Sequence, residues 1–400
     1  MRVLFLTHRL PYAPNRGDRL RAFHILQWLR DRATVDLVSL VHDDEEATHV
    51  DEVRAFVSNV TTLRVPWVRN RLRAVAALAT STPLTHTLLD APGVTEALTR
   101  NVIDRPPDVV FSFGSGMARL ALRPPLAGLP LILDLVDVDS RKWRDLAAAS
   151  PPPLSWVYSR EAKLLGAFEA RAAATAIVTL VVNDREAEIA RSLSPSATVQ
   201  VIANGVELDR LRPTAAPSER PRIVFCGVMN YAPNEQGIRW FINDVWPIVK
   251  SRRPDATLAI VGADPTASLK ALCARDEKIE LTGRVPDVRP WLWESAVGIA
   301  PLQVARGVQN KALEAIAAGL PIVITPAVAE GLPRQVSAAS SVAADPEFFA
   351  EHVGTLLAMS ADARRARAEL ADLSALQWSN TLHPLGQLLE SALASLTRRA

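Results

Sequence analysis

The 400-residue sequence predicts an α/β protein with two doubly wound, parallel-sheet domains that face a central cleft. Its length exceeds the usual size of one hydrophobic core. Short apolar runs alternate with longer helical patterns, and the runs are apolar at consecutive positions, as in parallel strands that are covered on both faces. A polar, proline-rich stretch at residues 203–221 suits a linker and separates the runs into two sets.

Each set of apolar runs predicts one sheet. The N-terminal set comprises residues 3–7, 35–40, 109–112, 131–134, 177–182 and 199–202. The C-terminal set comprises residues 223–226, 258–261, 279–281, 297–300 and 322–325. We therefore expect an N-terminal domain at residues 1–205 and a C-terminal domain at residues 206–375. The closing segment, residues 376–400, contains an amphipathic helix that we expect to return to the N-terminal domain.

Composition and charge limit the classes of function. The formal net charge is +2, whereas a dedicated nucleic-acid-binding protein shows a large basic excess, so we expect no nucleic-acid partner. The N-terminal residues lack the pattern of a signal peptide, and no uncharged apolar run is long enough to span a bilayer. The two cysteines lie in apolar runs, which is typical of reduced thiols. These features predict a cytoplasmic protein.

Ligands of doubly wound sheets bind beyond the carboxyl ends of the strands, so the loops that follow the strands are the candidate sites. Gly17 opens the helix after the first strand, where free N–H groups favour a phosphate; a plain turn is an equal alternative. Asp134, Asp137 and Asp139 cluster just past a buried strand, where carboxylates need partners or a ligand. We favour a polar ligand or helix capping there over a metal, because no third ligand is evident beyond Asp137 and Asp139. The absence of a G-x-G-x-x-G pattern argues against a dinucleotide fold of the dehydrogenase type.

Two loops of the C-terminal domain are further candidates. In LTGRVPDVRPWL, a flat ring could lie against the backbone near Arg284 and Val285, and a turn without a ligand fits equally well. The stretch VARGVQNKALEAIAAGLPIVIT, residues 304–325, places Lys311 and Glu314 on one face of a helix that begins near Gly307.

That helix predicts a binding site for an anion and for hydroxyl groups. The cation of Lys311 and the helix dipole suit a diphosphate, and Glu314, one turn deeper, suits a pair of sugar hydroxyls. Arg306 and Asn310 lie beside them in the sequence. An intrahelical Lys–Glu pair on a solvated face is the alternative. The flanking ALEAIAAGLPIVI is too apolar for a surface helix, which favours ligand contact.

NKALEAIAAGLPIVIT resembles the donor-site signature of GT-B glycosyltransferases, specifically glycosyltransferase family 4. The segment VVNDREAEIARSLSPSATVQVIANGVELDRLRP resembles the interdomain segment of that family, and FCGVMNYAPNEQGIRWF, IVGADP and LTGRVPDV follow in the family's order. QWSNTLHPLGQLLESAL resembles its closing helix. Together with the N-terminal THRLPYAPNRGDRLR, the chain is most similar to the sugar transferases of bacterial exopolysaccharide and PEP-CTERM gene clusters.

The resemblance implies two Rossmann-like domains, a nucleoside-diphosphate sugar as co-substrate held mainly by the C-terminal domain, and retention of anomeric configuration. We expect no further cofactor, and we expect no metal because the sequence offers no credible ligand set beyond Asp137 and Asp139. Glu314 would bind the donor ribose, and Lys311 and the N–H groups after Gly307 would lie near the diphosphate and sugar. Arg284 and Val285 would meet the base.

In the N-terminal domain, the resemblance implies that Gly17 meets the phosphate. Asp137 or Asp139 would take the place of a residue that contacts the sugar and is often histidine in relatives.

Two positions depart from the family pattern. The family usually has a glutamate eight residues before the ribose-binding one, and here that residue is Arg306. The family usually has a basic residue directly after the glycine that follows the first strand of the C-terminal domain, and here that residue is Val228. The resemblance therefore implies that phosphate and sugar contacts are redistributed onto Arg306, Lys311 and Asn230.

The sequence thus predicts a retaining glycosyltransferase that moves a sugar from a nucleoside-diphosphate sugar to a glycan or lipid-linked acceptor in exopolysaccharide synthesis. Two alternatives stay open. A nucleotide-sugar epimerase of GT-B fold would show catalytic carboxylate and histidine sets that the sequence does not reveal. A non-catalytic GT-B scaffold is suggested by Arg306.

A basic segment predicts a further partner. Residues 54–88 contain no acid. In and just after WVRNRLRAVAAL, one helical face is apolar and comprises Val68, Leu72, Val75 and Ala79, while Arg69 and Arg73 share another face. This pattern fits peripheral contact with an anionic membrane, at the inner face of the plasma membrane. A basic helix packed on its own domain is an equal alternative.

Overall fold

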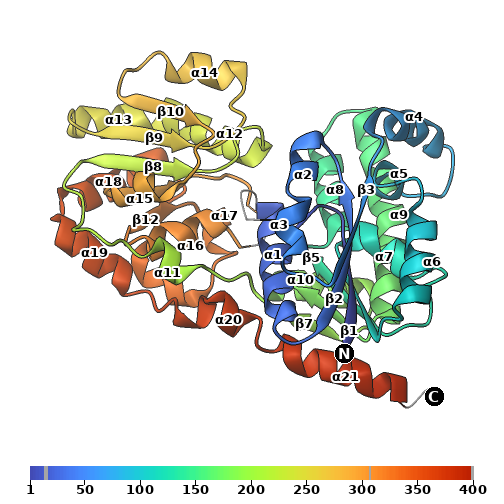
Figure 1. The fold of residues 1–400 in the computed structure, drawn as a ribbon. Helices are drawn as coiled ribbons and strands as arrows, with labels where there is room; N and C mark the ends of the chain where they lie inside the picture. The colour runs from blue at the N-terminus through green and yellow to red at the C-terminus, as the bar shows by residue number, and fades with distance from the viewer. Residues whose placement is uncertain (13–16, 306–307, 398–400) are drawn as a thin grey trace. The chain divides into compact units, whose positions relative to one another are not determined.

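The computed structural model describes residues 1–12, 17–305 and 308–397, and the chain divides into two compact α/β units (Figure 1). Unit 1 comprises Met1–Ala203 with Leu382–Ala400, and unit 2 comprises Asn204–Thr381. None of the helices in the described ranges combines the length and hydrophobicity needed to cross a bilayer.

The sheet of unit 1 is parallel throughout. Within the described residues it has seven strands in the order β3-β2-β1-β4-β5-β6-β7. The strands are β1 (Arg2–Thr7), β2 (Thr34–Val41), β3 (Asn59–Arg64), β4 (Val109–Phe113), β5 (Leu131–Val136), β6 (Val178–Val181) and β7 (Val199–Val201). Val3 of β1 is paired with Val35 of β2 on one side and with Val109 of β4 on the other. The strand order therefore reverses between β1 and β4, where α/β proteins of this type bind ligands.

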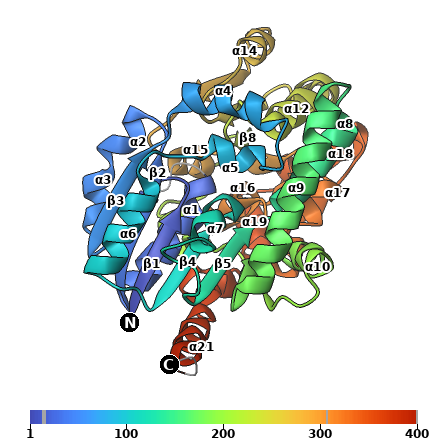
Figure 2. The ribbon, with the colours of Figure 1, turned by 90° about the vertical axis from the view of Figure 1, so that its right-hand side faces the viewer.

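Helices cover both faces of this sheet (Figures 1 and 2). They are α1 (Gly17–Arg30), α2 (Asp44–Thr48), α3 (Val50–Arg54), α4 (Trp67–Ala77), α5 (Leu84–Leu88), α6 (Val94–Asp104), α7 (Ser115–Ala121), α8 (Asp139–Ala149), α9 (Leu154–Thr175), α10 (Asp184–Leu193) and α21 (Leu385–Thr397). The C-terminal helix α21 belongs to this unit because it buries Leu385, Leu389 and Ala392. A side chain built on Gly386 would lie 3.7 Å from the ring of Trp28 on α1.

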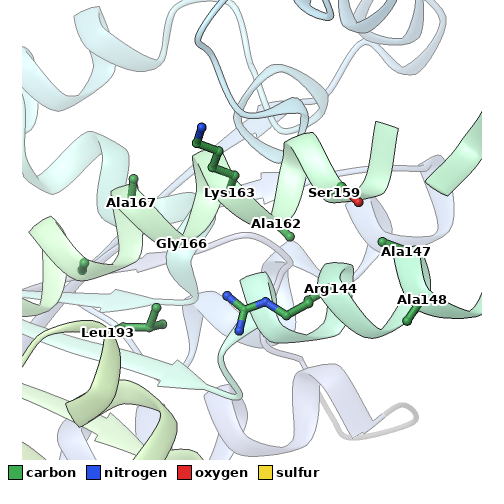
Figure 3. A pocket seen from close by; sticks show the side chains of 10 residues that line it. Arg144, Ala147, Ala148, Ser159, Ala162, Lys163, Gly166, Ala167 and Leu193 are labelled. Atoms are coloured by element: carbon green, nitrogen blue, oxygen red, sulfur yellow. The ribbon is translucent and has the colours of Figure 1, made fainter. Parts of the chain in front are cut away.

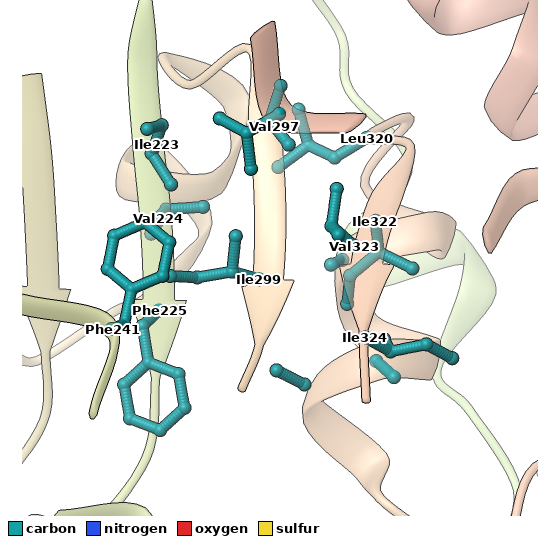
Figure 4. Packing of buried hydrophobic residues seen from close by; sticks show 14 of the residues in the cluster. Ile223, Val224, Phe225, Phe241, Val297, Ile299, Leu320, Ile322, Val323 and Ile324 are labelled. Atoms are coloured by element: carbon teal, nitrogen blue, oxygen red, sulfur yellow. The ribbon is translucent and has the colours of Figure 1, made fainter. Parts of the chain in front are cut away.

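Unit 2 repeats the same design. Its parallel sheet has six strands within the described residues, in the order β10-β9-β8-β11-β12-β13. They are β8 (Arg222–Cys226), β9 (Thr257–Val261), β10 (Ile279–Gly283), β11 (Val297–Ala300), β12 (Ile322–Ile324) and β13 (Ser340–Val342). Figure 4 shows buried side chains of the core on neighbouring strands, among them Phe225 of β8, Ile299 of β11 and Val323 of β12, together with Phe241. The order reverses between β8 and β11, so the expected ligand position is defined in this unit too.

The helices of unit 2 follow the strands in alternation. They are α11 (Leu208–Leu211), α12 (Ala232–Trp240), α13 (Trp246–Arg252), α14 (Ala267–Cys273), α15 (Arg289–Trp293), α16 (Asn310–Ala317), α17 (Pro326–Ala329), α18 (Pro346–Ala358), α19 (Ala361–Glu369) and α20 (Trp378–Thr381). A π-helical turn, Phe241–Val245, joins α12 to α13. The turn Arg334–Ala339 precedes β13, and Ser374–Leu376 precedes α20; both are 3₁₀ helices.

The two strands β3 and β13 are absent from the sequence prediction. Both are edge strands, and every side chain in them is only half-buried or exposed. Their sequences, NVTTLR and SSV, are rich in polar residues and contain no apolar run. An edge strand needs one paired side only, so its hydrophobic signal is weak.

The predicted linker at residues 203–221 is wrong in its first half. Val206 and Leu211 are buried in the core of unit 2, and Val206 forms a β-bridge with Gln377. The indole N–H of Trp293 donates to the carbonyl oxygen of Leu211 at 2.7 Å. Single apolar residues between prolines and charges give little sequence signal, which is why this packed segment resembled a free linker.

Candidate functional site

Glycine residues close the carboxyl ends of three neighbouring strands in unit 2. The N–H of Gly227, after β8, donates to Val261 at 2.9 Å, and the N–H of Gly262, after β9, donates to Gly283 at 3.1 Å. A Cβ atom on Gly262 would lie 1.7 Å from the carbonyl oxygen of Gly227. The loops after β8 and β9 are thus in backbone contact, and no side chain fits between them.

Lys311 lies beside this glycine loop. It is on α16, the helix that follows β11, and β11 pairs with β8 at the point where the strand order reverses. A Cβ atom on Gly227 would lie 3.5 Å from Cε of Lys311. The fold therefore brings Lys311 to the crevice that α/β sheets use for ligands.

The Lys311 side chain is half-buried, and its ammonium group donates one side-chain hydrogen bond within the described residues. Its Nζ donates to Oε1 of Gln309 at 2.9 Å and lies 5.9 Å from the ring centroid of Phe225. Burial lowers the pKa of Lys311 to about 8, against the opposing effect of the nearby Glu314 carboxylate. Most of the Lys311 side chains therefore carry a positive charge at pH 7, so this position can hold an anion.

Glu314 lies one turn further along α16. Burial raises the pKa of its carboxyl group, Lys311 lowers it, and Glu207 raises it. Within the described residues, the Glu314 carboxylate forms neither a hydrogen bond nor an ion pair, and Lys311 is not its salt-bridge partner. A half-buried carboxylate normally has hydrogen-bond donors, so this one can accept them from a bound ligand.

The first turn of α16 also contains a buried polar atom, and its start has no side-chain cap. Its N-cap residue, Gln309, makes no side-chain cap hydrogen bond to the helix. The buried Oδ1 of Asn310 has no hydrogen-bond partner among the described residues. Free N–H groups at a helix start favour a negatively charged ligand. Arg306 and Gly307, which the sequence places just before this turn, lie outside the described residues.

Asn234 is a site residue that the sequence analysis missed. It is buried on α12, and its Nδ2 donates to the carbonyl oxygen of Val228 at 2.9 Å. Its Oδ1 is buried without a partner among the described residues. Asn230, the predicted contact in the same loop, is exposed, and its Nδ2 lies 3.5 Å from Oδ2 of Asp264. The available signal for Asn234 was a polar residue in the first turn after the strand-ending Gly227.

The predicted base-binding residues follow β10. Gly283 adopts φ +69°, a left-handed conformation that suits glycine. Arg284 is exposed, and Val285 is half-buried and packs against the core of unit 2. Asp287 accepts the N–H of Arg289 at 2.9 Å, which fixes the start of α15. Arg284 and Val285 therefore lie on the same edge of the sheet as Gly227 and Gly262.

In unit 1, α1 begins at Gly17, as predicted, and the two predicted aspartates follow β5. Val136 has φ +66°, which is strained for a β-branched residue, and this kink precedes Asp137. Oδ1 of Asp137 is buried without a partner among the described residues, and burial with nearby Glu186 raises its pKa to about 6. Asp139 accepts the Ser115 hydroxyl at 2.9 Å.

Asp134, the aspartate nearest to this pair in the sequence, has a different role. Its Oδ2 accepts Nε of Arg21 at 2.7 Å, and both side chains are buried. Arg21 also donates to the carbonyl oxygen of Ile202 at 2.7 Å. This ion pair joins α1 to β5 and is structural, because both side chains are buried and bind each other. Its long sequence separation hides it from pattern analysis.

Buried glutamates support the same loop of unit 1. Glu186 accepts the N–H of Val138 at 2.8 Å, and Glu169 accepts the N–H of Ser140 at 3.2 Å. Burial and the charge of Asp139 raise the pKa of Glu169 to about 8. Despite these carboxylates, the described part of the chain contains no group of three or more His, Cys, Asp or Glu side chains suited to a metal ion.

A groove of about 660 Å³ lies elsewhere in unit 1, between α8 and α9. Figure 3 shows Arg144 between these helices, whereas Lys163 points away from them. The rest of the lining consists mainly of small residues, and none of the predicted site residues takes part. The groove is therefore separate from the site at the strand ends.

Comparison with known proteins gives the class of the protein. Residues 220–359, which include the glycine loops, Lys311 and Glu314, match the family described as Glycosyl transferases group 1. No curated protein matches the chain. Sucrose-phosphate synthase from Thermosynechococcus elongatus is similar in structure, with a TM-score of 0.73, 16% identity, and coverage of 99% of this chain and 100% of the other.

The protein is a glycosyltransferase of the GT-B fold. Two further structures share the fold of this glycosyltransferase. HepE from Anabaena in complex with UDP-glucose has a TM-score of 0.66 and 16% identity, over 98% of this chain and 100% of that one. WaaG, a glycosyltransferase involved in lipopolysaccharide biosynthesis, has a TM-score of 0.62 and 17% identity, over 95% and 98%.

Proposed function

We propose that this glycosyltransferase moves a sugar from a nucleoside-diphosphate sugar to a glycan or lipid-linked acceptor, with retention of anomeric configuration. The reaction takes place in the cytoplasm, at the inner face of the plasma membrane, in bacterial exopolysaccharide synthesis. The proposal is carried by two side chains on one face of α16. Lys311 is a half-buried cation, and Glu314 is a half-buried carboxylate without a hydrogen-bond or ion-pair partner among the described residues.

The donor roles follow from the chemistry of these groups. The Lys311 ammonium and the uncapped N–H groups of α16 suit a diphosphate, which carries negative charge and many acceptor oxygens. The Glu314 carboxylate is an acceptor only and suits the two ribose hydroxyls, which are donors. The structures of HepE with UDP and with UDP-glucose support a donor of this kind.

The proposed reaction requires one bond exchange. The bond between the anomeric carbon and the diphosphate oxygen breaks, and the acceptor hydroxyl oxygen bonds to the same carbon from the same face. The acceptor proton passes to the departing diphosphate oxygen. Negative charge grows on the diphosphate as its bond breaks, so a fixed cation such as Lys311 stabilises the transition state more than the ground state.

A panel of nucleotide sugars tests the proposal. The purified protein is incubated with each donor, and release of nucleoside diphosphate is measured with and without a lipid-linked acceptor. We expect one donor to be turned over, with NMR of the transferred sugar showing the donor's anomeric configuration. An inverted product would overturn the retaining mechanism, and interconversion of the donor to an epimer would favour an epimerase.

A further inference from the structure

Helix α4 contacts the rest of unit 1 along one narrow face. Asn70 and Ala77 are buried on that face, and Ala74 between them is half-buried. Residues of an α-helix advance by about 100° each. Val68, Leu72 and Val75 therefore lie on the side opposite to the buried face, and their exposed fractions are 63%, 70% and 67%. The apolar stripe of this helix therefore faces away from the part of unit 1 on which the helix packs.

The orientation of α4 is fixed by its buried face. Nδ2 of Asn70 donates to the carbonyl oxygens of Leu88 at 3.1 Å and Asp90 at 2.7 Å. Arg73 forms an ion pair with Asp90. These contacts tie α4 to the segment after α5, so the helix cannot turn its apolar stripe inward without losing them.

Arginines border the apolar stripe on both sides. Arg69 and Arg73 lie along one border, and Arg71 lies along the other, with its guanidinium 3.9 Å above the ring of Trp67. The Trp67 side chain is 57% exposed. Apolar side chains flanked by arginines and a tryptophan form the pattern of a helix that lies in a lipid interface.

The beginning of α9 extends this surface. Nη2 of Arg160 donates to the carbonyl oxygens of Ala77 at 2.6 Å and Thr82 at 3.1 Å, so the first turns of α9 adjoin the end of α4. Trp156, one helical turn before Arg160, is 70% exposed, and Leu154 is 50% exposed. Two exposed tryptophans thus flank one apolar stripe.

We propose that α4 and the first turn of α9 form a docking surface for an anionic lipid bilayer. Val68, Leu72 and Val75 enter the acyl boundary, Trp67 and Trp156 lie at the headgroup level, and the arginines contact lipid phosphates. The proposal rests on the proposed function in one respect only: the surface would place the enzyme next to a lipid-linked acceptor in the bilayer.

The charge of the surface selects a bilayer over a second copy of the chain. In a symmetric dimer, Arg69 and Arg71, which border the stripe, would face arginines of the second copy, and residues 54–88 contain no acid to neutralise them. In an anionic bilayer, each charged headgroup carries the negative charge that these arginines need. The apolar stripe then supplies the area that holds the helix in the interface.

Vesicle flotation of the full chain tests the proposal. Wild type is mixed with vesicles of phosphatidylcholine alone or with about one third phosphatidylglycerol, at low and high salt. We expect binding to the anionic vesicles, weakened by salt. Changing Arg69 and Arg71 to Gln is expected to reduce it about fivefold for each charge removed. Changing Val68, Leu72 and Val75 together to Ser is expected to reduce it at least about a hundredfold.

A matched control is Ile103→Ser on α6, because Ile103 is 72% exposed outside this surface. It should bind vesicles like wild type. The proposal would be overturned if wild type bound no vesicles, if it bound neutral vesicles equally well, or if the triple serine variant at Val68, Leu72 and Val75 bound as well as wild type. It would also be overturned if wild type bound no vesicles but self-associated, and the triple serine variant did not self-associate. Donor hydrolysis without vesicles should be equal in wild type and all variants. If wild type hydrolysed no donor, that result would count against the proposed function and not against the docking surface.

Discussion

Lys311 and Glu314 occupy one face of α16, yet each faces a different chemical environment. The Lys311 ammonium has one protein acceptor, Gln309, while the Glu314 carboxylate has no hydrogen-bond donor among the described residues. Burial shifts both pKa values towards the neutral forms. Burying these two charged groups costs free energy, and no hydrogen bond or ion pair joins them among the described residues, so we propose that a bound donor completes the environment of both.

The charge of Lys311 predicts a pH dependence. Its pKa is about 8 in the free protein, so the positive charge is present below that pH and is lost as the pH rises through 8. We expect kcat/KM for the donor to fall up to about tenfold per pH unit above 8. In Lys311→Arg this fall should disappear, because a guanidinium stays protonated.

The pH profiles of wild type, Lys311→Arg and Lys270→Arg are the measurement. Lys270 is an exposed lysine on α14, so its replacement should leave the profile unchanged. A fall above pH 8 that persists in Lys311→Arg would assign it to another group and remove Lys311 from the reaction.

At the residue scale, the sequence predicted the α16 pair but not its surroundings. Lys311 and Glu314 are visible because charges are rare in an apolar, small-residue segment. Asn234 and the Arg21–Asp134 ion pair were not, since their partners lie on other elements of the fold. Local patterns reveal an unusual residue, whereas the contact that gives it a role depends on the tertiary structure.

At the scale of elements, the site depends on backbone contact between the loops after β8 and β9. Gly262→Ala would place Cβ 1.7 Å from the carbonyl oxygen of Gly227, and the φ of +151° at Gly262 is unfavourable for alanine as well. Both loops would have to move. We expect a loss of stability of more than about 2 kcal/mol, together with weaker donor binding.

Gly354→Ala is the matched control, because Gly354 lies inside α18 and a Cβ there would meet no atom within 4 Å. Alanine in a helix interior is expected to add about 0.5–1 kcal/mol of stability. Chemical denaturation of both variants measures the difference. Equal stability of the two would show that the loops after β8 and β9 tolerate separation.

The elements themselves differ in how clearly the sequence encodes them. The central strands were predicted because both of their faces are buried and their sequences are continuously apolar. The edge strands β3 and β13 were missed because pairing on one side, with little burial, leaves no such run. The first half of the predicted linker was wrong for the related reason that isolated buried residues such as Val206 give no pattern.

At the scale of the whole molecule, the two units share one design, and their strand order reverses between β1 and β4 and between β8 and β11. The candidate site residues lie in the loops and helical turns that follow these strands and their neighbours. The sequence predicted this α/β architecture from the alternation of runs and helices alone. The surroundings of each candidate site residue, by contrast, depend on side chains from several elements, which the alternation of runs and helices does not encode.

Catalysis is predicted to need no divalent metal. The leaving diphosphate would be stabilised by Lys311 and the N–H groups of α16, which are fixed by the protein. Donor turnover in excess EDTA should therefore equal turnover in magnesium or manganese. Activity that disappears with the chelator and returns with either ion would contradict this expectation.

Donor binding by Glu314→Gln tests the central claim most directly. The glutamine keeps the shape but loses charge-assisted hydrogen bonds of roughly 1.5–3 kcal/mol each. Calorimetric titration with the preferred nucleoside diphosphate should show binding about ten- to a hundredfold weaker than in wild type and in Glu351→Gln, an exposed control on α18. Because burial raises the pKa of Glu314, the neutral variant should melt at the wild-type temperature or higher. Unchanged affinity in Glu314→Gln would contradict the assignment of α16 as the donor site.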